Sequence, residues 1–141
     1  MEKDTRILLV DDEPLVRRSI EKTLLRAGFD VDTAKDAMAG LTLFQAVLDG
    51  EEDVEEGPFD LAILDLHMPN LEGQDDPDAG LKLLTKLLEV ESTLPVIVLT
   101  AFDEVARAKE AVARGARAYF VKGREAGLLE LVNAIMDEEK S

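Results

Sequence analysis

The stretch Phe59-Asp60-Leu61-Ala62-Ile63-Leu64-Asp65 decides the fold class of this chain. Its uninterrupted apolar run, Leu61 to Leu64, is typical of a strand that is buried on both faces, as strands of parallel sheets are. Asp65 ends the run, at the start of the loop Leu66-His67-Met68-Pro69. A carboxylate at the tip of a buried strand contributes little to packing, so this position indicates chemistry.

Three further runs have the same character: Ile7 to Val10, Val96 to Leu99 and Ala118 to Val121. A fifth, Phe29 to Thr33, alternates apolar and polar residues as an edge strand does. Segments with helical spacing lie between them, one of them about Glu104 to Arg114. Because parallel strands need helical crossovers, the pattern predicts an α/β fold, a doubly wound five-stranded parallel sheet.

Residues that favour helix starts and stops mark the expected helix ends. Pro14 suits the first turn of the first helix, Gly28 its C-terminal stop, and Asp78 a cap of the third helix. We expect one domain over residues 1–141, with an ordered core of about 5–137. Two acidic loops interrupt it, at 49–58 and 70–78.

Composition excludes several classes of function. The chain has no cysteine, which removes disulfides, thiolate metal sites and cysteine nucleophiles. Its net charge of −15 argues against direct binding to nucleic acid. No apolar run approaches the ~20 residues of a membrane helix, and Met1-Glu2-Lys3-Asp4 is not a signal peptide, so we expect a cytoplasmic protein without a membrane partner. Only segment 100–124 is positive, with six basic and three acidic residues. It is either a solvated helix face or a surface for self-association, including a phosphorylation-dependent dimer, or for an acidic partner.

Polar residues end four of the five predicted strands. They are Asp11-Asp12, Asp65, Thr100 and Lys122. Each alone has a simple structural role available, such as helix capping by Asp12 or Thr100. However, the carboxyl ends of parallel strands meet at one edge of the sheet, where ligands bind. We therefore expect these groups to share one crevice.

The expected group has a coherent chemistry. Three carboxylates at close range repel one another unless a cation joins them, and oxygen ligands with room for water suit Mg²⁺. A carboxylate can attack phosphorus and form an acyl phosphate. A lysine and a hydroxyl would balance charge on the phosphoryl oxygens. The sequence predicts Mg²⁺-dependent phosphoryl transfer onto Asp65.

Four motifs carry a resemblance to the response-regulator receiver domain of two-component signalling: Leu9-Val10-Asp11-Asp12-Glu13-Pro14, Leu64-Asp65-Leu66-His67-Met68-Pro69, Val98-Leu99-Thr100-Ala101 and Gly115 to Lys122. The resemblance implies a flavodoxin-like sheet of order 2-1-3-4-5. It also implies a histidine kinase or phosphotransfer protein as donor and a downstream protein partner, which meets the surface of helix four, strand five and helix five.

The resemblance assigns roles residue by residue. Asp65 would be the phosphoacceptor, Thr100 and Lys122 would contact the phosphoryl group, and Tyr119 would be the aromatic switch. The implied Mg²⁺ ligands are Asp12 directly, Asp11 mainly through water, Asp65 and the backbone carbonyl of His67. The His67 and Phe102 side chains would tune water access and the phosphoryl lifetime. Alternatively, His67 has no role and Tyr119 is an aromatic plug.

Two departures from the family pattern stand out. Gly123 follows Lys122 where the family usually has a proline with a cis peptide, so we expect a trans peptide here. Ten residues, Asn70 to Ala79, separate Pro69 from Gly80, where the family has a short segment. The extra residues either screen the site or form a partner surface.

Two other functions compete with the signalling receiver. A constitutive, phosphorylation-independent interaction module is favoured by Lys122-Gly123 and the inserted loop, but the intact acidic set argues against it. An aspartyl phosphatase would want a second acid where His67 stands. The chain leaves no room for an output domain after residues 125–141, so we expect a protein that acts through contacts alone, or a fragment of a longer regulator. A receiver would be a phosphoacceptor that assists its own chemistry, not an enzyme.

Overall fold

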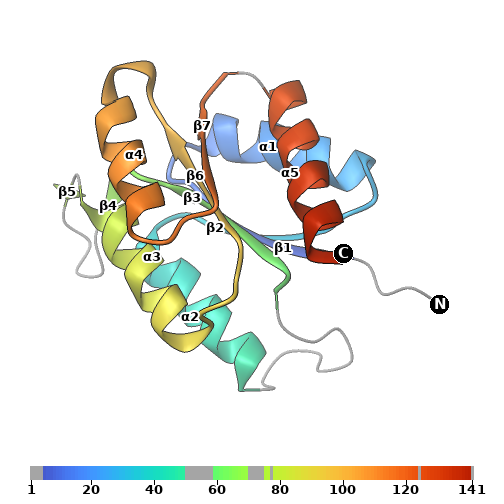
Figure 1. Cartoon of the computed structure of the whole chain (residues 1–141), viewed down its shortest axis with the longest axis horizontal. Coiled ribbons are helices and arrows are strands. Elements are labelled where there is room, and N and C mark those ends of the chain that lie inside the picture. Colours follow the sequence, from blue (N-terminus) through green and yellow to red (C-terminus); the bar gives the residue numbers. More distant parts are fainter. Residues whose placement is uncertain (1–4, 50–58, 70–74, 77, 124, 141) are drawn as a thin grey trace.

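The computed structural model describes residues 5–49, 59–69, 75–76, 78–123 and 125–140. A parallel five-stranded sheet forms its centre (Figure 1). The strands are β1 (Arg6–Val10), β2 (Asp30–Ala34), β3 (Leu61–Asp65), β6 (Val96–Thr100) and β7 (Ala118–Val121). Their order is β2-β1-β3-β6-β7, which is 2-1-3-4-5 along the chain. The predicted fold class and strand order are confirmed, and the alternating strand does lie at an edge.

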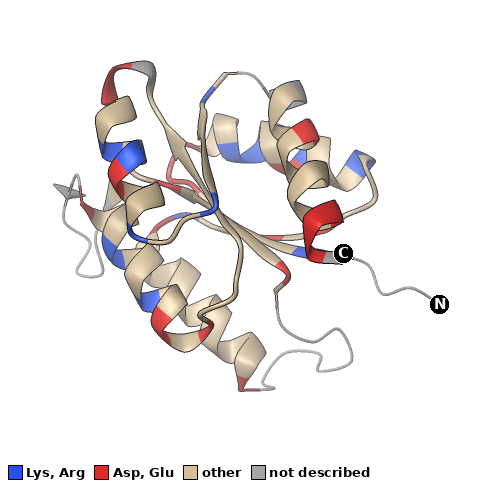
Figure 2. Ribbon diagram, viewed as in Figure 1, with Lys and Arg blue, Asp and Glu red and all other residues tan. Residues whose placement is uncertain are grey.

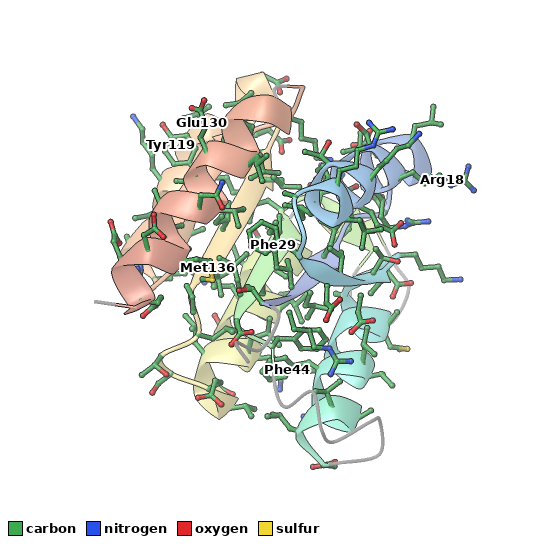
Figure 3. The ribbon with its side chains drawn as sticks, turned by 90° about the vertical axis from the view of Figure 1, so that its right-hand side faces the viewer. Arg18, Phe29, Phe44, Tyr119, Glu130 and Met136 are labelled. Carbon is green, nitrogen blue, oxygen red and sulfur yellow. The ribbon has the colours of Figure 1, made fainter. Side chains whose placement is uncertain are left out.

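Helices cover both faces of the sheet (Figures 1 and 3). The helices are α1 (Pro14–Arg26), α2 (Ala37–Leu48), α3 (Ala79–Val90), α4 (Val105–Ala113) and α5 (Glu125–Lys140), and a 3-10 turn, η2 (Phe102–Glu104), precedes α4. Buried residues of α1 and α5 form one core cluster with the sheet, and those of α2, α3 and α4 form the other. The sheet is therefore a middle layer between two helical layers.

The central strands contribute to both clusters in alternation. In β1, Leu8 and Val10 face the α2–α3–α4 side, whereas Ile7 and Leu9 face α1 and α5. All five residues of β1, of β3 and of β6 are buried. Burial on both faces explains why these strands are continuous apolar runs in the sequence.

The predicted start, stop and cap residues of the helices are confirmed only in part. Pro14 is the first residue of α1, and Gly28 takes φ +97° just after its end, a left-handed conformation that glycine tolerates well. Asp12 does not cap α1, because Glu13 holds that position without a side-chain cap bond. Asp78 stands at the cap of α3, but its side chain pairs with Arg107 of α4 and makes no cap bond.

The predicted loop 70–78 is partly structured where it is described. Met68–Pro69 (β4) pairs antiparallel with Asp75–Asp76 (β5). Most of that loop, with all of 49–58 except Asp49, lies outside the described residues. The first strand of this added ribbon begins three residues after Asp65 in the chain.

Segment 100–124 carries several of the basic positions that Figure 2 marks in blue, and much of this positive charge is paired within the chain. Arg107 pairs with Asp78 and Arg114 with Glu110, while Arg117 lies 3.2 Å from Glu138 and 2.6 Å from Glu139. These pairs weaken the case for a free positive docking surface. Across the described residues, none of the helices combines the length and the apolar character needed to cross a bilayer.

Candidate functional site

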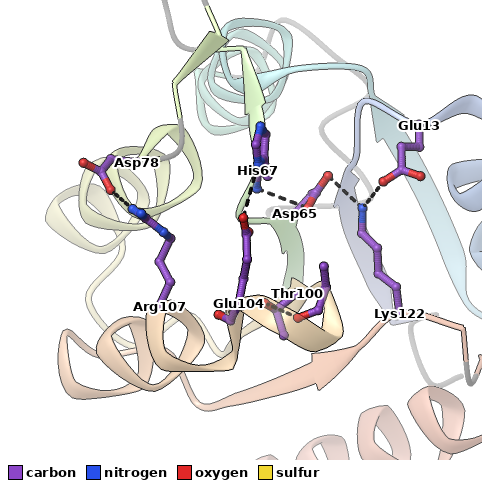
Figure 4. Close-up of polar contacts among 9 residues, drawn as sticks. Glu13, Asp65, His67, Asp78, Thr100, Glu104, Arg107 and Lys122 are labelled. Carbon is purple, nitrogen blue, oxygen red and sulfur yellow. Dashed lines mark hydrogen bonds and ion pairs between the residues drawn. The ribbon is translucent and has the colours of Figure 1, made fainter.

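The carboxyl ends of the strands bring the predicted polar residues together (Figure 4). Asp11 follows β1, Asp65 ends β3, Thr100 ends β6 and Lys122 follows β7. Asp11 is fully buried and lies 3.4 Å from Lys122 Nζ, whereas Asp65, Thr100 and Lys122 line a pocket of about 210 Å³. Its lining residues are Asp12, Glu13, Asp65, His67, Thr100, Ala101, Glu104 and Lys122. The expectation of one shared crevice therefore describes this geometry well.

Lys122 is the centre of the charge network. Its Nζ lies 2.6 Å from Glu13 Oε1, 2.9 Å from Asp65 Oδ2 and 3.4 Å from Asp11 Oδ2. The lysine side chain is only 15% exposed. Burial lowers the pKa of Lys122, but the contacts with Glu13 and Asp65 outweigh burial and raise it. Lys122 therefore keeps its proton and serves as the fixed positive charge of the pocket.

The carboxylates outnumber that single charge. Burial, together with the charge of Asp11, raises the pKa of Asp65 from its ordinary 3.8 to about 8, because Lys122 opposes these two effects only in part. Burial likewise raises the pKa of Asp11. Without a cation, the crowded carboxyls hold an extra proton, since the lysine beside them does not give up its own.

The same cluster fits a hard cation. One carboxylate oxygen from each of four residues lies within 4.8 Å of the others: Asp11, Asp12, Glu13 and Asp65. Asp11 Oδ2 is buried and has no hydrogen-bond partner among the described residues. A buried carboxylate oxygen that lies 3.4 Å from an ammonium, and which is surrounded by further oxygens, is what a Mg²⁺ ion or its bound water would satisfy.

Close packing behind β3 fixes the position of Asp65. A Cβ on Gly80, the second residue of α3, would lie 2.5 Å from Leu66 Cα and 2.6 Å from the Asp65 carbonyl oxygen. The Gly80 amide donates to the Leu66 carbonyl at 3.2 Å. In addition, the His67 amide donates to Asp65 Oδ1 at 3.2 Å. The start of α3 thus supports the backbone that carries the carboxylate.

Thr100 lines the pocket, but its hydroxyl is bonded to the turn that leads into α4. Its Oγ1 lies 3.2 Å from the carbonyl oxygens of both Ala101 and Glu104, to which it can donate. Tyr119 is half-buried and packs against the core cluster on the α4 side of the sheet. Thr100 and Tyr119 thus lie on neighbouring strands, beside a helix that buries only two residues, Ala108 and Ala111.

Two acidic residues of the pocket were not predicted as site residues. Glu13 directly follows the acidic pair Asp11-Asp12, so its place in the sequence could have predicted that it lies at the pocket. Glu104 reaches the pocket through η2 and lies 3.7 Å from His67 Nδ1. The side chain of Phe102 lies outside the described part of the chain, so its predicted tuning role stays a prediction. The metal role of the His67 carbonyl does too.

The loop after Lys122 is closed by glycine. The Lys122–Gly123 peptide is trans, as expected, and Gly123 takes φ +104° with open space around its Cα. The Lys122 amide donates to the Thr100 carbonyl at 2.9 Å. Lys122 therefore reaches Asp65 without the proline that usually follows the lysine in the resembled family.

A protein-family model described as the response regulator receiver domain matches residues 7–135. The chain belongs to the response-regulator receiver family. It is 30% identical over 118 residues to the chemotaxis protein CheY of Treponema pallidum, which covers 83% of this chain and 72% of that protein. It is also 37% identical over 117 residues to a probable transcriptional regulator, ycf27, of Cyanophora paradoxa, which covers 83% of this chain and 41% of that protein.

Solved receiver structures have the same fold. A CheY-like receiver domain protein from Methanospirillum hungatei superposes with a TM-score of 0.78 at 25% identity, with 98% of each chain covered. The response regulator TrrA of Thermotoga maritima, in complex with Mg²⁺ and BeF, gives a TM-score of 0.69 at 29% identity, with 92% of this chain and 97% of that one covered.

The relatives differ greatly in length from this chain. It spans 41% of ycf27 and 24% of the regulatory protein AtoC of Escherichia coli, to which it is 32% identical. Receiver domains are signalling phosphoacceptors that interact with kinases and effectors, and they use Mg²⁺ at an acidic pocket. Membership of the family therefore gives the kind of chemistry, whereas the partners and output of this chain are matters for proposal.

Proposed function

We propose that Asp65 accepts a phosphoryl group and that the phosphorylated chain regulates a protein partner. The observation that carries this proposal is the pairing of the buried Asp65 carboxylate with Lys122 at 2.9 Å, beside a second buried acid, Asp11. Core packing would exclude such a charged set unless it had a use, because buried charge is costly. The donor would be a histidine kinase or a phosphotransfer protein.

The residues that would hold Mg²⁺ are Asp12 directly, Asp11 through water, Asp65, and the backbone carbonyl of His67. When bound, the ion neutralises charge on the transferring phosphoryl oxygens and lowers the repulsion between the carboxylates. The buried Oδ2 of Asp11, which makes no hydrogen bond among the described residues, supports this assignment. With that repulsion lowered, the Asp65 carboxylate would be deprotonated and available as a nucleophile.

The transfer itself forms one bond and breaks one. An Asp65 carboxylate oxygen attacks phosphorus, and the bond from phosphorus to the donor imidazole nitrogen breaks, with its electron pair staying on the imidazole. Lys122 shifts its ammonium from the carboxylate to a phosphoryl oxygen. To donate to a different phosphoryl oxygen, the Thr100 hydroxyl has to break its hydrogen bonds to the carbonyls of Ala101 and Glu104.

This exchange by Thr100 links chemistry to signal. Its hydroxyl bonds the turn that starts α4, so moving the hydroxyl toward Asp65 loosens that turn. Tyr119 then turns into the space beside Thr100, and the surface formed by α4, β7 and α5 changes. A downstream protein, or a second phosphorylated copy in a dimer, would read that surface.

The test is phosphoryl uptake. The protein is incubated with Mg²⁺ and a small acyl phosphate, and intact mass is measured. We expect one added phosphoryl group in the wild type and none in Asp65→Asn. Uptake that persists in Asp65→Asn would place the acceptor elsewhere. A wild type that takes up nothing, with or without a kinase, would instead support the constitutive interaction module.

A further inference from the structure

Glu13 has a role in this pocket that the family assignment does not supply. We propose that Glu13 is a positioning residue that holds Lys122 back from the phosphoryl group and so slows phosphorylation of Asp65. The inference rests on the proposed function of Asp65 and deepens it. It concerns which of its partners Lys122 binds before and after transfer.

The contacts of Lys122 carry this inference. Glu13 Oε1 makes the shortest of its three carboxylate contacts, 2.6 Å against 2.9 Å for Asp65 and 3.4 Å for Asp11. The three acids differ sharply in exposure. The Glu13 side chain is 57% exposed, whereas those of Asp65 and Asp11 are 3% and 0% exposed. Glu13 is therefore the one contact that can be given up to solvent at little cost.

The start of α1 aims Glu13 at the lysine. The Glu13 amide donates to Asp11 Oδ1 at 2.8 Å, and the following Pro14 begins the helix. Proline fixes its own φ and restricts the residue before it to extended conformations. Glu13 has φ −89° and ψ 109°, as this restriction requires. Its side chain therefore starts from a constrained backbone that also orients Asp11.

A competition follows from this geometry. The Lys122 ammonium has three N–H donors, and in the unphosphorylated pocket carboxylates surround it. A phosphoryl group on Asp65 brings new anionic oxygens that need the same donors. Each donor that stays on Glu13 is lost to the phosphoryl group. The Glu13 contact consequently stabilises the unphosphorylated state relative to the phosphorylated one.

Metal binding is the competing role for Glu13, because its carboxylate also belongs to the oxygen cluster with Asp11, Asp12 and Asp65. However, Glu13 Oε1 already accepts a hydrogen bond from the Lys122 ammonium at 2.6 Å, so its negative charge has a cationic partner without a metal. A metal ligand and a lysine partner respond differently to mutation. Loss of a ligand weakens Mg²⁺ binding, whereas loss of a lysine partner changes phosphoryl chemistry and leaves Mg²⁺ affinity nearly unchanged.

Two variants separate contact from charge. Glu13→Gln removes the charge and weakens the bond to Lys122, while Glu13→Asp keeps the charge on a side chain that is one methylene too short to reach. The matched control is Glu104→Gln, which removes an equal charge from the same pocket and whose wild-type carboxylate lies against His67. Initial rates of phosphorylation by a small acyl phosphate with saturating Mg²⁺ are measured for all four proteins, and Mg²⁺ affinity by calorimetry.

We expect both Glu13 variants to be phosphorylated roughly two- to fivefold faster than the wild type, the size that a partly exposed ion pair allows. The Glu104→Gln rate should change less, and Mg²⁺ affinity should stay within about twofold in both Glu13 variants. Equal rates for Glu13→Asp and wild type would reduce the effect to charge alone and overturn the inference. So would a loss of Mg²⁺ affinity in Glu13→Gln, which would make Glu13 a ligand. A wild type without uptake would overturn the function of Asp65, and this inference with it.

Discussion

Replacing the carboxylate of Asp65, the proposed phosphoacceptor, should stabilise the metal-free protein. We expect Asp65→Asn to unfold at higher urea concentration than the wild type at pH 7 in the presence of EDTA. Asp65 is 2% exposed and lies among other acids with one lysine as counter-charge. Asparagine keeps the shape of the side chain and removes the charge. The folded protein would thus be less stable with aspartate at position 65 than with asparagine.

The magnitude follows from the raised pKa of Asp65, which goes from 3.8 to about 8. An acid whose pKa is higher in the folded protein stabilises the fold only below its unfolded pKa, and this contribution is lost as pH rises toward the folded pKa. At about 1.4 kcal/mol per pH unit, the loss reaches about 4 kcal/mol at pH 7. The raised pKa already includes the contact with Lys122, which lowers it, so no separate cost for the lost bond is subtracted. We therefore expect a net gain of up to about 4 kcal/mol.

Urea denaturation followed by circular dichroism at 222 nm measures this difference, since the chain has no tryptophan. Between pH 4 and pH 8 the advantage of Asp65→Asn should grow, and above pH 8 it should level off. Added Mg²⁺ should stabilise the wild type and narrow the gap. As a control, Asp103→Asn removes an exposed carboxylate next to the pocket and should shift stability by less than about 0.5 kcal/mol. A metal-free wild type that is the more stable protein at pH 7, or a gap that ignores pH, would refute the reasoning.

Three further predictions concern the surroundings of Asp65. His67→Asn and Phe102→Glu should change the dephosphorylation rate more than the phosphorylation rate, and unchanged decay of the phosphoprotein in both would contradict a role in water access. Phosphorylation should speed or slow amide exchange in residues 101–115, because α4 buries little apolar surface; identical exchange in the two forms would argue against a shifting helix. Gly80→Ala should destabilise the chain by about 1–3 kcal/mol in urea, because its Cβ would meet backbone at 2.5 Å. Gly127→Ala, whose Cβ would meet only the Phe120 ring at 3.2 Å, should cost less, and equal losses would show that close approach is not the cause.

The sheet could be predicted from the sequence because its central strands are buried on both faces. Short uninterrupted apolar runs such as Ile7 to Val10 are typical of strands in that position, and the crossover rule then limits the topology. The charged start of β1 could not be predicted. Arg6 is buried because Asp32 on β2 binds it at 2.8 Å and the Phe59 ring lies 5.0 Å from its guanidinium. Partners so distant in sequence leave no local signal.

The sequence also predicted which residues lie at the site, because the sheet topology determines where the strands end. It did not predict the partners of their side chains. Strand ends converge in any sheet of this topology, so the polar residue at each end could be placed without coordinates. What the side chains bond to depends on tertiary packing. The Thr100 hydroxyl donates to the Glu104 carbonyl, and the Asp78 side chain pairs with Arg107 instead of capping its own helix. Both choices depend on how α4 sits, which no short-range pattern encodes.

The charge balance of the pocket is a physical reason to expect a cation in the site before the proposed phosphoryl group arrives. Five carboxylates line or adjoin the pocket: Asp11, Asp12, Glu13, Asp65 and Glu104. Lys122 is the fixed positive charge among them. Phosphorylation converts the single charge of Asp65 into about two. Adding that charge to an already negative, half-buried pocket would be costly without a divalent ion. The excess of acid thus links the stability of the metal-free pocket to the proposed phosphoryl uptake. An acid that occupies Lys122, as Glu13 does, leaves more of the incoming phosphoryl charge for other groups to balance.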